Sequence, residues 1–532
     1  MRLLMVGACL LVPLAGCGSG APATPDDSAP AENTPNIVLF LVDDMGWSDL
    51  GVYGSELYDT PTIDRFASES VRFTSAYAAG HVCSPTRASL MTGKYPARLR
   101  LTDWLPGRRE HDFEPLLSAE KALALPLAEV TLAETLREHG FRTGIFGKWH
   151  LGDEEAGPLN QGFDVQVPSW NGCCPRGGYH PPYEMEGLAV EGEADEYVTD
   201  RLTDFAVGFI DDHVAESGDR PFFLYLSHFS VHDPIQGRED LVEKYRERLA
   251  ARAEPSGPAF VLEGNPDDMP PLSQDELGAL AEQPSHREHR VLPQRTVQIK
   301  QHQDNPEFAA MVESIDESLG RVLDTLERTG QLDNTIVVFY SDNGGMSAAN
   351  FGNPERVVAD DRLDVAYATS NLPLRGAKGW LYEGGVRVPL IVRWPGAAGG
   401  GSVRDEPVIS PDLYPTLLEM AGLPTRPEQH VDGVSFASAV RGDAFDRGAI
   451  YWHFPHYSNH GMQSPGGAIR DGNYKLLEYF ENDTVQLFDL SADPGETRDL
   501  AHADPERADT LRAQLHEWRR QVSAAMPRPR QP

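Results

Sequence analysis

Short runs of consecutive apolar residues, many of them β-branched, recur along the first part of the chain. The run at 36–42 reads Asn-Ile-Val-Leu-Phe-Leu-Val, and comparable runs occupy 142–146, 221–229 and 335–341. Continuous apolar runs, as opposed to alternating ones, are typical of strands that are buried on both faces of a parallel sheet. The pattern therefore predicts four such strands.

Helical periodicity fills the stretches between these strands. Apolar positions recur at helical spacing over 130–139, 197–214 and 308–329. Strands that alternate with helices indicate a parallel sheet covered on both faces. We therefore expect an α/β fold with a large, mostly parallel sheet sandwiched by helices.

The pattern changes after Pro395. A helical segment at 412–421 is followed by short alternating runs and then by a closing helix at 506–522. The alternating runs lie at 449–454, 467–470, 474–479 and 485–490. Alternation is typical of half-buried strands, so we expect a smaller C-terminal antiparallel sheet plus a helix.

These changes divide the chain into regions. The main α/β domain is expected at 36–400, and the polar, Pro-containing stretch 235–305 within it has the character of an insertion. A C-terminal α+β subdomain is expected at 401–525. The tail 526–532 is expected to be disordered.

The N-terminus has the pattern of an export signal. Arg2 precedes an apolar run at 3–14, which is too short to span a membrane, and the run is followed by Ala15-Gly16-Cys17. This ending resembles a bacterial lipoprotein signal, which implies that a signal peptide at 1–16 is removed and that Cys17 carries lipid. The alternative is a plain signal peptide with an incidental cysteine. Residues 17–35 are rich in Pro, Ala, Ser and Asp and favour a flexible tether. We expect an exported protein, lipid-anchored to a bacterial membrane on the periplasmic side or the cell surface.

Charge and cysteine content exclude some classes of protein. The formal net charge of −35 argues against nucleic acid as a partner. Five cysteines are present, and only the adjacent pair Cys173 and Cys174 is left once Cys9, Cys17 and Cys83 are assigned elsewhere. No disulfide framework is therefore expected. A vicinal disulfide would be strained, which favours free thiols or a structural role, and the sequence leaves this choice open.

One loop concentrates candidate chemistry. A strand-like run at 71–78 leads into Cys83-Ser-Pro85-Thr-Arg87-Ala-Ser-Leu-Met-Thr-Gly93. Because Pro suits the first helical turn, we expect a helix to begin near Pro85. Cys83 then lies at a helix N-terminus, where negative charge is stabilised, and Arg87 lies one turn further on the same face. Such a cysteine has the setting of an activated nucleophile; the alternative is a buried structural cysteine.

Polar residues also follow the ends of the predicted strands. Ligands bind at the carboxyl ends of strands in open α/β sheets. The residues found there are Asp43, Asp44, Lys148, His150, His232, Asp342 and Asn343. The Asp and Asn oxygens are hard ligands that suit calcium or magnesium. Taken singly, each residue could instead be a solvated turn residue or a structural histidine.

Together these motifs resemble those of the formylglycine-dependent sulfatases of the alkaline phosphatase superfamily. The resemblance runs from about Asn36 to the C-terminal region, with the motifs in the family's order. It implies that a formylglycine-generating maturation enzyme oxidises Cys83 to formylglycine. It also implies one divalent cation, usually calcium, at Asp43, Asp44, Cys83, Asp342 and Asn343.

The resemblance further implies roles for the basic residues. Hydrated formylglycine attacks the sulfur of a sulfate ester, and the covalent sulfate is then expelled as the aldehyde re-forms. Arg87 and Lys148 would hold the hydrate and the metal site, and His150 would be the base for the elimination. His232 and Lys378, together with Lys148, would bind sulfate, and His232 and Lys378 would help to protonate the leaving oxygen.

The substrate is less constrained. Aromatic and basic residues in loops could rim the pocket, since aromatic rings stack on sugars and Arg pairs with sulfate. They are Trp104, Arg108, Arg109, Trp170, His180, Trp452, His453, His456 and Tyr457. They could equally be packing residues. We expect a sulfated carbohydrate, with aryl sulfates as artificial substrates. Two alternatives remain: a formylglycine-dependent phosphonate or phosphate monoester hydrolase, and a non-catalytic carbohydrate-binding lipoprotein.

Overall fold

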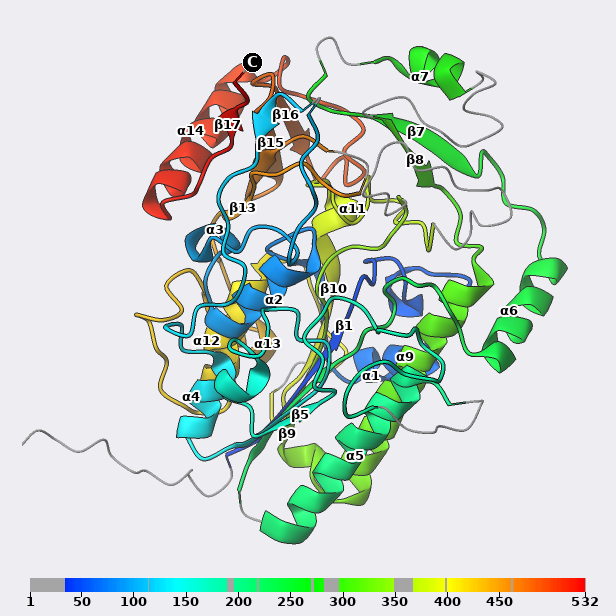
Figure 1. Ribbon diagram of the computed structural model, residues 1–532, viewed down its shortest axis with the longest axis vertical. Coiled ribbons are helices and arrows are strands. Elements are labelled where there is room, and N and C mark those ends of the chain that lie inside the picture. Colours follow the sequence, from blue (N-terminus) through cyan, green and yellow to red (C-terminus); the bar gives the residue numbers. More distant parts are fainter. Residues whose placement is uncertain are drawn as a thin grey trace, which may run out of the picture.

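A computed structural model gives the fold of the chain (Figure 1). It describes residues 34–112, 114–188, 196–217, 220–268, 272–281, 296–348, 367–397, 400–460 and 463–531. The predicted signal peptide and almost all of the predicted tether, with Cys17, lie outside these ranges. No helix in the described ranges has the length and apolar character needed to cross a membrane.

A nine-stranded sheet forms the centre of the molecule. Its strands are β1 Asn36–Val42, β2 Val71–Tyr77, β4 Arg142–Gly147, β5 Val165–Val167, β6 Phe222–Ser227, β9 Thr335–Ser341, β10 Arg387–Arg393, β11 Val403–Arg404 and β12 Val408–Ile409. The order is β11-β2-β10-β9-β1-β6-β4-β5, with β12 also paired to β2. Only β10 runs antiparallel to its neighbours β2 and β9. The predicted mostly parallel sheet is confirmed.

Helices cover both faces of this sheet, as Figure 1 shows for α5 and α9 on one side and α2, α4 and α12 on the other. Even-numbered residues of β1 such as Phe40 face the α5–α9 side, and odd-numbered residues such as Leu39 face the α2 side. Every residue of β1 is buried, as its unbroken apolar run predicts. The helices are α1 Pro61–Ser68, α2 Cys83–Thr92, α3 Pro96–Leu99, α4 Leu132–Glu138, α5 Val198–Ser217, α6 Glu239–Ala251, α7 Gln274–Ala281, α9 Pro306–Arg328, α11 Glu383–Val386, α12 Leu413–Met420, α13 Ala437–Arg441 and α14 Pro505–Gln521.

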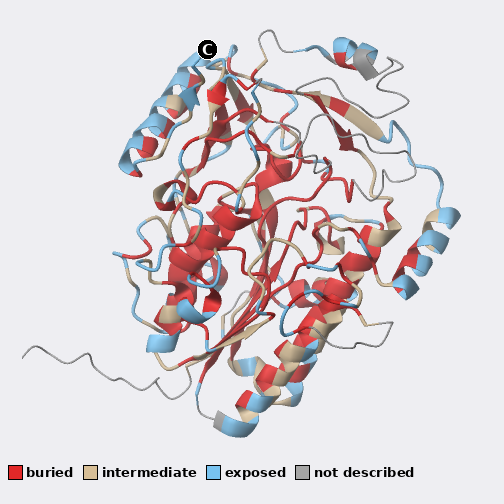
Figure 2. Cartoon of the chain, in the orientation of Figure 1, coloured by how far each residue is buried: buried red, intermediate tan, exposed pale blue. Residues whose placement is uncertain are grey.

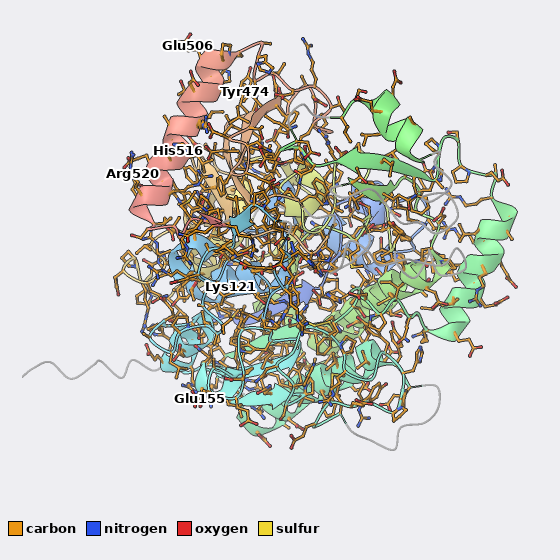
Figure 3. The ribbon with its side chains drawn as sticks, turned by 45° about the horizontal axis from the view of Figure 1, so that its top comes forward. Lys121, Glu155, Tyr474, Glu506, His516 and Arg520 are labelled. Atoms are coloured by element: carbon orange, nitrogen blue, oxygen red, sulfur yellow. A yellow bond between two sulfur atoms is a disulfide. The ribbon has the colours of Figure 1, made fainter. Side chains whose placement is uncertain are left out.

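A smaller antiparallel sheet follows near the C-terminus, also as predicted. Its strands, in spatial order, are β13 Ile450–Phe454, β14 Gly466–Asp471, β15 Tyr474–Tyr479 and β16 Val485–Asp489. Helix α14 packs against this sheet; in Figure 3, Glu506, His516 and Arg520 mark the helix and Tyr474 marks the neighbouring strand β15. Strands β11 and β12 pair with β2, so the central sheet extends beyond the predicted boundary at residue 401.

The stretch 235–305 contains more regular structure than its sequence indicates. Helix α6 packs against α9, and β7 Phe260–Gly264 pairs with β8 Thr296–Lys300. Asp267 then accepts hydrogen bonds from the backbone N–H groups of Glu481 and Asn482 in the C-terminal region. The described part of this stretch therefore bridges the central helices and the smaller sheet.

Two other local features differ from expectation. The tail residues Arg528–Pro529 form β17, which pairs with β3 at Leu116–Leu117, so the tail is not disordered up to residue 531. Cys173 and Cys174 are joined as a vicinal disulfide, the alternative that the strain argument disfavoured.

Candidate active site

The candidate residues converge at one edge of the central sheet. Strands β1, β4, β6 and β9 run parallel to one another, so their carboxyl ends meet there. Helix α2 approaches the same edge, and all of its residues are buried in the middle of the molecule (Figure 2). The helix begins at Cys83, two residues before Pro85. Cys83 therefore occupies the first turn, where N–H groups have no helical partner.

Asp43 links the nucleophile loop to the basic residues. Its Oδ1 lies 3.5 Å from the Cys83 Sγ, which donates to it, and its Oδ2 lies 2.6 Å from the Lys148 Nζ. The Nη2 of Arg87 lies 3.6 Å from Oδ1. Burial opposes ionisation, but Lys148, His232 and Arg87 together hold the pKa of Asp43 far below its usual value. Asp43 is therefore a carboxylate.

Asp44 holds a second group of partners. Its Oδ2 accepts a hydrogen bond of 2.7 Å from the Lys378 Nζ and lies 3.6 Å from the His232 Nε2. Its Oδ1 accepts from the Asn343 side-chain amide at 2.8 Å. Asp44 has a positive φ of 59°, a conformation that is uncommon for non-glycine residues and that recurs at functional sites.

Arg87 joins three strand ends. Its Nε donates to the Asp342 Oδ2 at 2.7 Å, and its Nη1 donates to the Lys148 carbonyl and to the Ser227 Oγ. Ser227, the last residue of β6, was not predicted as a site residue, because a serine after an apolar run carries no distinctive signal. The fully buried guanidinium thus fixes β4, β6 and β9 around Cys83.

The two predicted catalytic histidines differ in charge. Burial and the neighbouring Lys148 lower the pKa of His150 well below its usual value, so its ring is neutral. Its Nε2 lies 2.7 Å from the Leu105 carbonyl, whereas its Nδ1 has no hydrogen-bond partner among the described residues. Burial opposes a charge on His232, but Asp44 and Asp233 raise its pKa well above the usual value. His232 is therefore an imidazolium.

The donor set fits a hard divalent cation. Ligand atoms of Asp43, Asp44, Cys83 and His232 lie within 4.8 Å of one another. The Asn343 Oδ1 is buried and has no hydrogen-bond partner among the described residues, although buried polar atoms are nearly always bonded. Asp342 differs from Asn343 because both of its carboxylate oxygens already accept hydrogen bonds, the Oδ1 from the Asp44 N–H and the Oδ2 from Arg87. The oxygens of Asp43, Asp44, Asp342 and Asn343 suit calcium or magnesium better than a soft metal.

Several predicted rim residues are packing residues. Trp452 is buried, and its indole N–H donates to the Ala78 carbonyl, while the His453 Nε2 bonds the Ala525 carbonyl. Tyr457 is buried and donates to Glu481, and Arg108 pairs with Glu114.

The other residues of the predicted rim differ in their bonding and exposure. The Trp170 indole N–H donates to the Cys174 carbonyl. His180 bonds the Gly237 carbonyl, and His456 bonds Thr102. Trp104 is half-buried, and Arg109 is exposed. These two are the members of the predicted rim that the structure leaves most open to a ligand.

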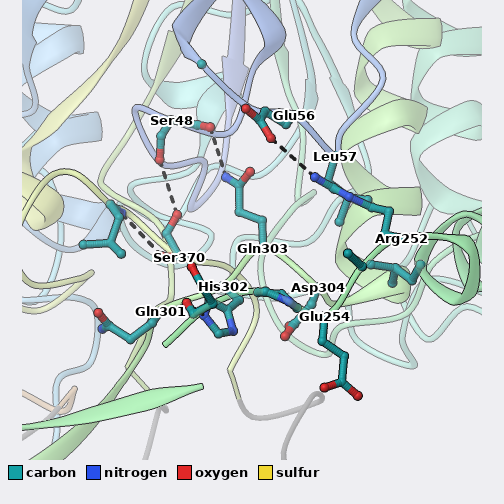
Figure 4. Close-up of a pocket in the computed structure, with 16 residues that line it drawn as sticks. Ser48, Glu56, Leu57, Arg252, Glu254, Gln301, His302, Gln303, Asp304 and Ser370 are labelled. Atoms are coloured by element: carbon teal, nitrogen blue, oxygen red, sulfur yellow. Dashed lines mark hydrogen bonds and ion pairs between the residues drawn. The ribbon is translucent and has the colours of Figure 1, made fainter. Parts of the chain in front are cut away.

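A separate pocket of about 760 Å³ lies beside the loop that follows β1 (Figure 4). None of the residues that converge around Cys83 lines it. Its charged residues include Glu56, Glu254 and Asp304 against Arg252, so it offers no excess of positive charge for a sulfate group. The pocket therefore lacks the positive charge expected of a sulfate-binding site.

Comparison with known proteins agrees with the geometry. The sulfatase family model matches residues 35–423, and a model for the C-terminal region of N-sulphoglucosamine sulphohydrolase matches 377–524. An uncharacterized sulfatase of Schizosaccharomyces pombe is 30% identical, over 91% of this chain and 92% of that protein. The N-acetylgalactosamine-6-sulfatase of Canis lupus familiaris is 29% identical, over 94% of this chain and 87% of that protein.

Solved structures give the same result. The crystal structure of Ps i-CgsB has a TM-score of 0.67 and 26% identity, over 91% of this chain and 92% of that chain. It has also been solved in complex with k-i-k-neocarrahexaose. The phosphonate monoester hydrolase of Agrobacterium radiobacter, with a TM-score of 0.59 and 20% identity, shares the fold. With the family model covering most of its length, this chain belongs to the sulfatase family and is a sulfuric ester hydrolase.

Proposed function

We propose that this sulfatase hydrolyses sulfate esters of carbohydrates, with Cys83 converted to formylglycine and one calcium ion bound. The observation that carries the proposal is the position of the Cys83 Sγ, in the first turn of α2 and 3.5 Å from Asp43. Lys148, Lys378 and Arg87 lie on the surrounding carboxylates. The Cys83 sulfur is surrounded by carboxylates, cations and a helix N-terminus. This setting stabilises an oxygen nucleophile that loses a proton, and a structural thiol would not need it.

Formylglycine would supply a hydrated aldehyde whose hydroxyl attacks sulfur. A thiolate in its place would form an adduct with no internal group to expel it. The hydroxyl on the Cβ of residue 83 would be the reacting group. Lys148 and Lys378, which pair with Asp43 and Asp44 beside Cys83, would bind the oxygens of the sulfate group.

The histidines have opposite proton-transfer roles in this proposal. The neutral His150 donates from Nε2 to the Leu105 carbonyl, which leaves Nδ1 with a free lone pair. His150 can therefore accept a proton at Nδ1. The His232 Nδ1 bonds the Asp233 carbonyl, so its Nε2–H is directed toward Asp44 and the site. His232, as an imidazolium, can donate this proton to the leaving oxygen.

Calcium would be held by Asp43, Asp44, Asp342 and Asn343. When bound, it would offset the negative charge on the sulfate oxygens. The unpartnered Asn343 Oδ1 supports a cation at this position, because no protein donor satisfies it in the described chain. The side chains of Lys148 and Lys378 limit the repulsion between the carboxylates until the cation is present.

The carbohydrate part of the proposal is supported by relatives. The structure of Ps i-CgsB has been solved with k-i-k-neocarrahexaose, and curated relatives include N-acetylgalactosamine-6-sulfatases. Turnover of a sulfated sugar panel, an aryl sulfate and a phenyl phosphonate monoester would test it. Preferential hydrolysis of the phosphonate would contradict it and favour the related phosphonate monoester hydrolase activity.

Mass spectrometry of the peptide that contains position 83 tests the nucleophile. Formylglycine should be present, and the specific activity should follow the modified fraction across preparations. Cys83→Ala should bind sulfated substrate without turning it over. Cys83→Ser should also be inactive unless the host maturation enzyme accepts serine. A highly active preparation that contains only unmodified Cys83 would contradict the formylglycine mechanism.

We also propose that the protein is exported and acylated at Cys17, on the basis of the Leu14-Ala-Gly-Cys17 sequence. Cys17→Ser should release the protein from the membrane fraction or block its processing. Wild-type protein recovered fully in the soluble fraction with an unmodified N-terminus would contradict this proposal.

A further inference from the structure

Two buried histidines have no hydrogen-bond partner on either ring nitrogen. His81 is 1% exposed and His460 is 2% exposed, and all four ring nitrogens are unpartnered among the described residues. Nine histidines are buried in the described chain, and each of the other seven has at least one bonded ring nitrogen. They are His150, His213, His228, His232, His430, His453 and His456. Because buried polar atoms are nearly always satisfied, His81 and His460 are exceptional.

Both histidines lie against the residue that follows Lys378. The Gly379 N–H donates to the His81 carbonyl at 2.8 Å. A Cβ atom on Gly379 would lie only 2.5 Å from the His460 Cβ, and the glycine has a φ of +87°. This close approach requires glycine. The His460 ring interacts electrostatically with Lys378, Asp233 and His232 and with the His81 ring, so the pair borders the groups proposed to bind sulfate.

The two rings belong to different parts of the fold. His81 precedes α2, whereas His460 follows β13 in the C-terminal region. His81 also packs on Phe454, with ring centroids 4.1 Å apart. The pair therefore lies where the segment before α2 meets the C-terminal region.

Both rings are buried away from water, and no hydrogen bond in the described chain uses any of their nitrogens. A neutral imidazole offers one N–H donor and one nitrogen acceptor. That combination matches a hydroxyl group, which both donates and accepts, better than it matches a sulfate group, which only accepts. Asp233, which also acts on His460, adds a further acceptor nearby.

We propose that His81 and His460 bind the hydroxyl groups of the sugar ring next to its sulfate ester. The inference rests on the proposed carbohydrate sulfatase activity and deepens it. An aryl sulfate without ring hydroxyls reaches the same nucleophile but makes neither contact. The two histidines therefore set the preference for a polyhydroxylated substrate over an aryl ester.

The test compares two substrates in matched variants of the full, metal-loaded protein. The first is 4-methylumbelliferyl sulfate, and the second is the best substrate from a panel of monosulfated galactose and N-acetylgalactosamine. His81→Leu and His460→Leu should each lower kcat/KM for the sugar about tenfold to a hundredfold, the loss typical of removing a buried hydrogen bond. Turnover of the aryl sulfate should change by less than about threefold. His460→Gln, which keeps a donor and an acceptor, should recover part of the sugar activity.

His213→Leu is the control, because His213 is buried but bonds the Arg220 carbonyl. It should leave the ratio of sugar to aryl turnover unchanged. The wild-type enzyme should hydrolyse a monosulfated sugar that lacks the neighbouring hydroxyl more slowly than the complete sugar. His460→Leu should hydrolyse this deoxygenated sugar no more slowly than the wild-type enzyme does.

Equal losses on both substrates would overturn the inference and leave the proposed function intact. A wild-type enzyme that hydrolyses the aryl sulfate and none of the sugars would overturn both the inference and the carbohydrate part of the proposed function.

Discussion

Two largely buried clusters of charge in the described part of the chain are built differently. The first, which we propose to be catalytic and here call the catalytic cluster, consists of Asp43, Asp44, Asp342, Asn343, Arg87, Lys148, Lys378, His150 and His232. The second, here called the buttress cluster, consists of Glu383, Glu496, Lys475, Arg387, Arg470 and Tyr77. Both contain carboxylates beside cations, and an inspection of charge and burial alone would not separate them.

The buttress cluster is closed by protein partners, because its one buried atom without a hydrogen bond among the described residues, the Glu496 Oε1, is paired with the Lys475 ammonium group. The Lys475 Nζ lies 2.9 Å from Glu383 and 3.0 Å from Glu496, and all three side chains are fully buried. The Tyr77 hydroxyl donates to Glu383 and accepts from Arg470. These contacts connect β2 of the central sheet, helix α11 and strands β14 and β15, so the cluster joins the two sheets.

The catalytic cluster has bonding capacity left over. The Asn343 Oδ1, the Arg87 Nη2 and the His150 Nδ1 have no hydrogen-bond partner among the described residues. Such unsatisfied groups reduce stability unless a ligand completes them. The difference teaches that saturation, more than charge or burial, distinguishes a structural ion cluster from a binding site.

The largest expected effect is on catalysis. Asp44→Asn should lower kcat for a sulfate ester at least about a thousandfold, about 4 kcal/mol, because Asp44 holds Lys378 and His232 and would hold the cation. The thermal midpoint should change by only a few degrees. The exposed Asp333→Asn is the control. A variant that retains a tenth of wild-type kcat would contradict the assignment of Asp44.

The buttress cluster should respond in the opposite way. Lys475→Met leaves Glu383 and Glu496 buried without their shared cation and should lower the free energy of unfolding by about 3–5 kcal/mol. The activity per folded molecule should be preserved. Lys244→Met, which removes a half-exposed lysine from Asp59 and Glu313, should cost about 0–1 kcal/mol. Equal losses in the two lysine variants would contradict the comparison.

Metal removal should affect the catalytic cluster and leave the buttress cluster unchanged. Chelation should abolish activity, and calcium should restore it. It should also lower stability by about 2.7 kcal/mol relative to protein with calcium at a hundredfold excess over its Kd. This shift should persist in Lys475→Met and disappear in Asp44→Asn. Full activity after chelation, with the metal content checked by elemental analysis, would contradict the cation site.

The sequence predicted that most residues of the catalytic cluster converge, because these residues follow the ends of strands. Asp43, Lys148 and Asp342 each follow a recognisable apolar run, and parallel strands bring their carboxyl ends together. The fold class followed from the same runs. The direction of β10 did not, because an apolar strand has the same composition whichever way it runs.

The features that the sequence did not predict depend on contacts between segments that are distant in the chain. Lys475 lies in a strand where a solvated lysine would be ordinary, and it is buried only because Glu383 and Glu496 meet it. Trp452 has the composition of a sugar-stacking residue but faces the central sheet. His81 and His460 carry no sequence signal, since the lack of a bonding partner is a property of the folded chain alone.

The smallest expected effect concerns pH and the buttress cluster. Burial raises the pKa of Glu496 to about 7, with Lys475 only partly offsetting it. Glu383 has further cationic partners in Arg387 and Arg470, and its pKa is lowered to about 2 despite burial. The folded protein therefore holds a proton on Glu496 that the unfolded chain, with an ordinary pKa of 4.5, releases earlier.

A carboxyl whose pKa is raised by folding contributes stability that is present below the unfolded pKa and lost as pH rises to the folded value. Between about pH 4.5 and 7, the free energy of unfolding of wild type should fall by about 1–3 kcal/mol through this group, since each unit of pKa shift corresponds to about 1.4 kcal/mol.

Glu496→Gln keeps the acceptor for the Glu383 N–H but removes the ionisable carboxyl. The measurement is the difference in unfolding free energy between wild type and Glu496→Gln across this window, with calcium saturating so that the catalytic cluster is held constant. The difference should shift in favour of the variant as pH rises. Parallel pH profiles would mean that Glu496 is ionised throughout and that Lys475 alone neutralises both carboxylates.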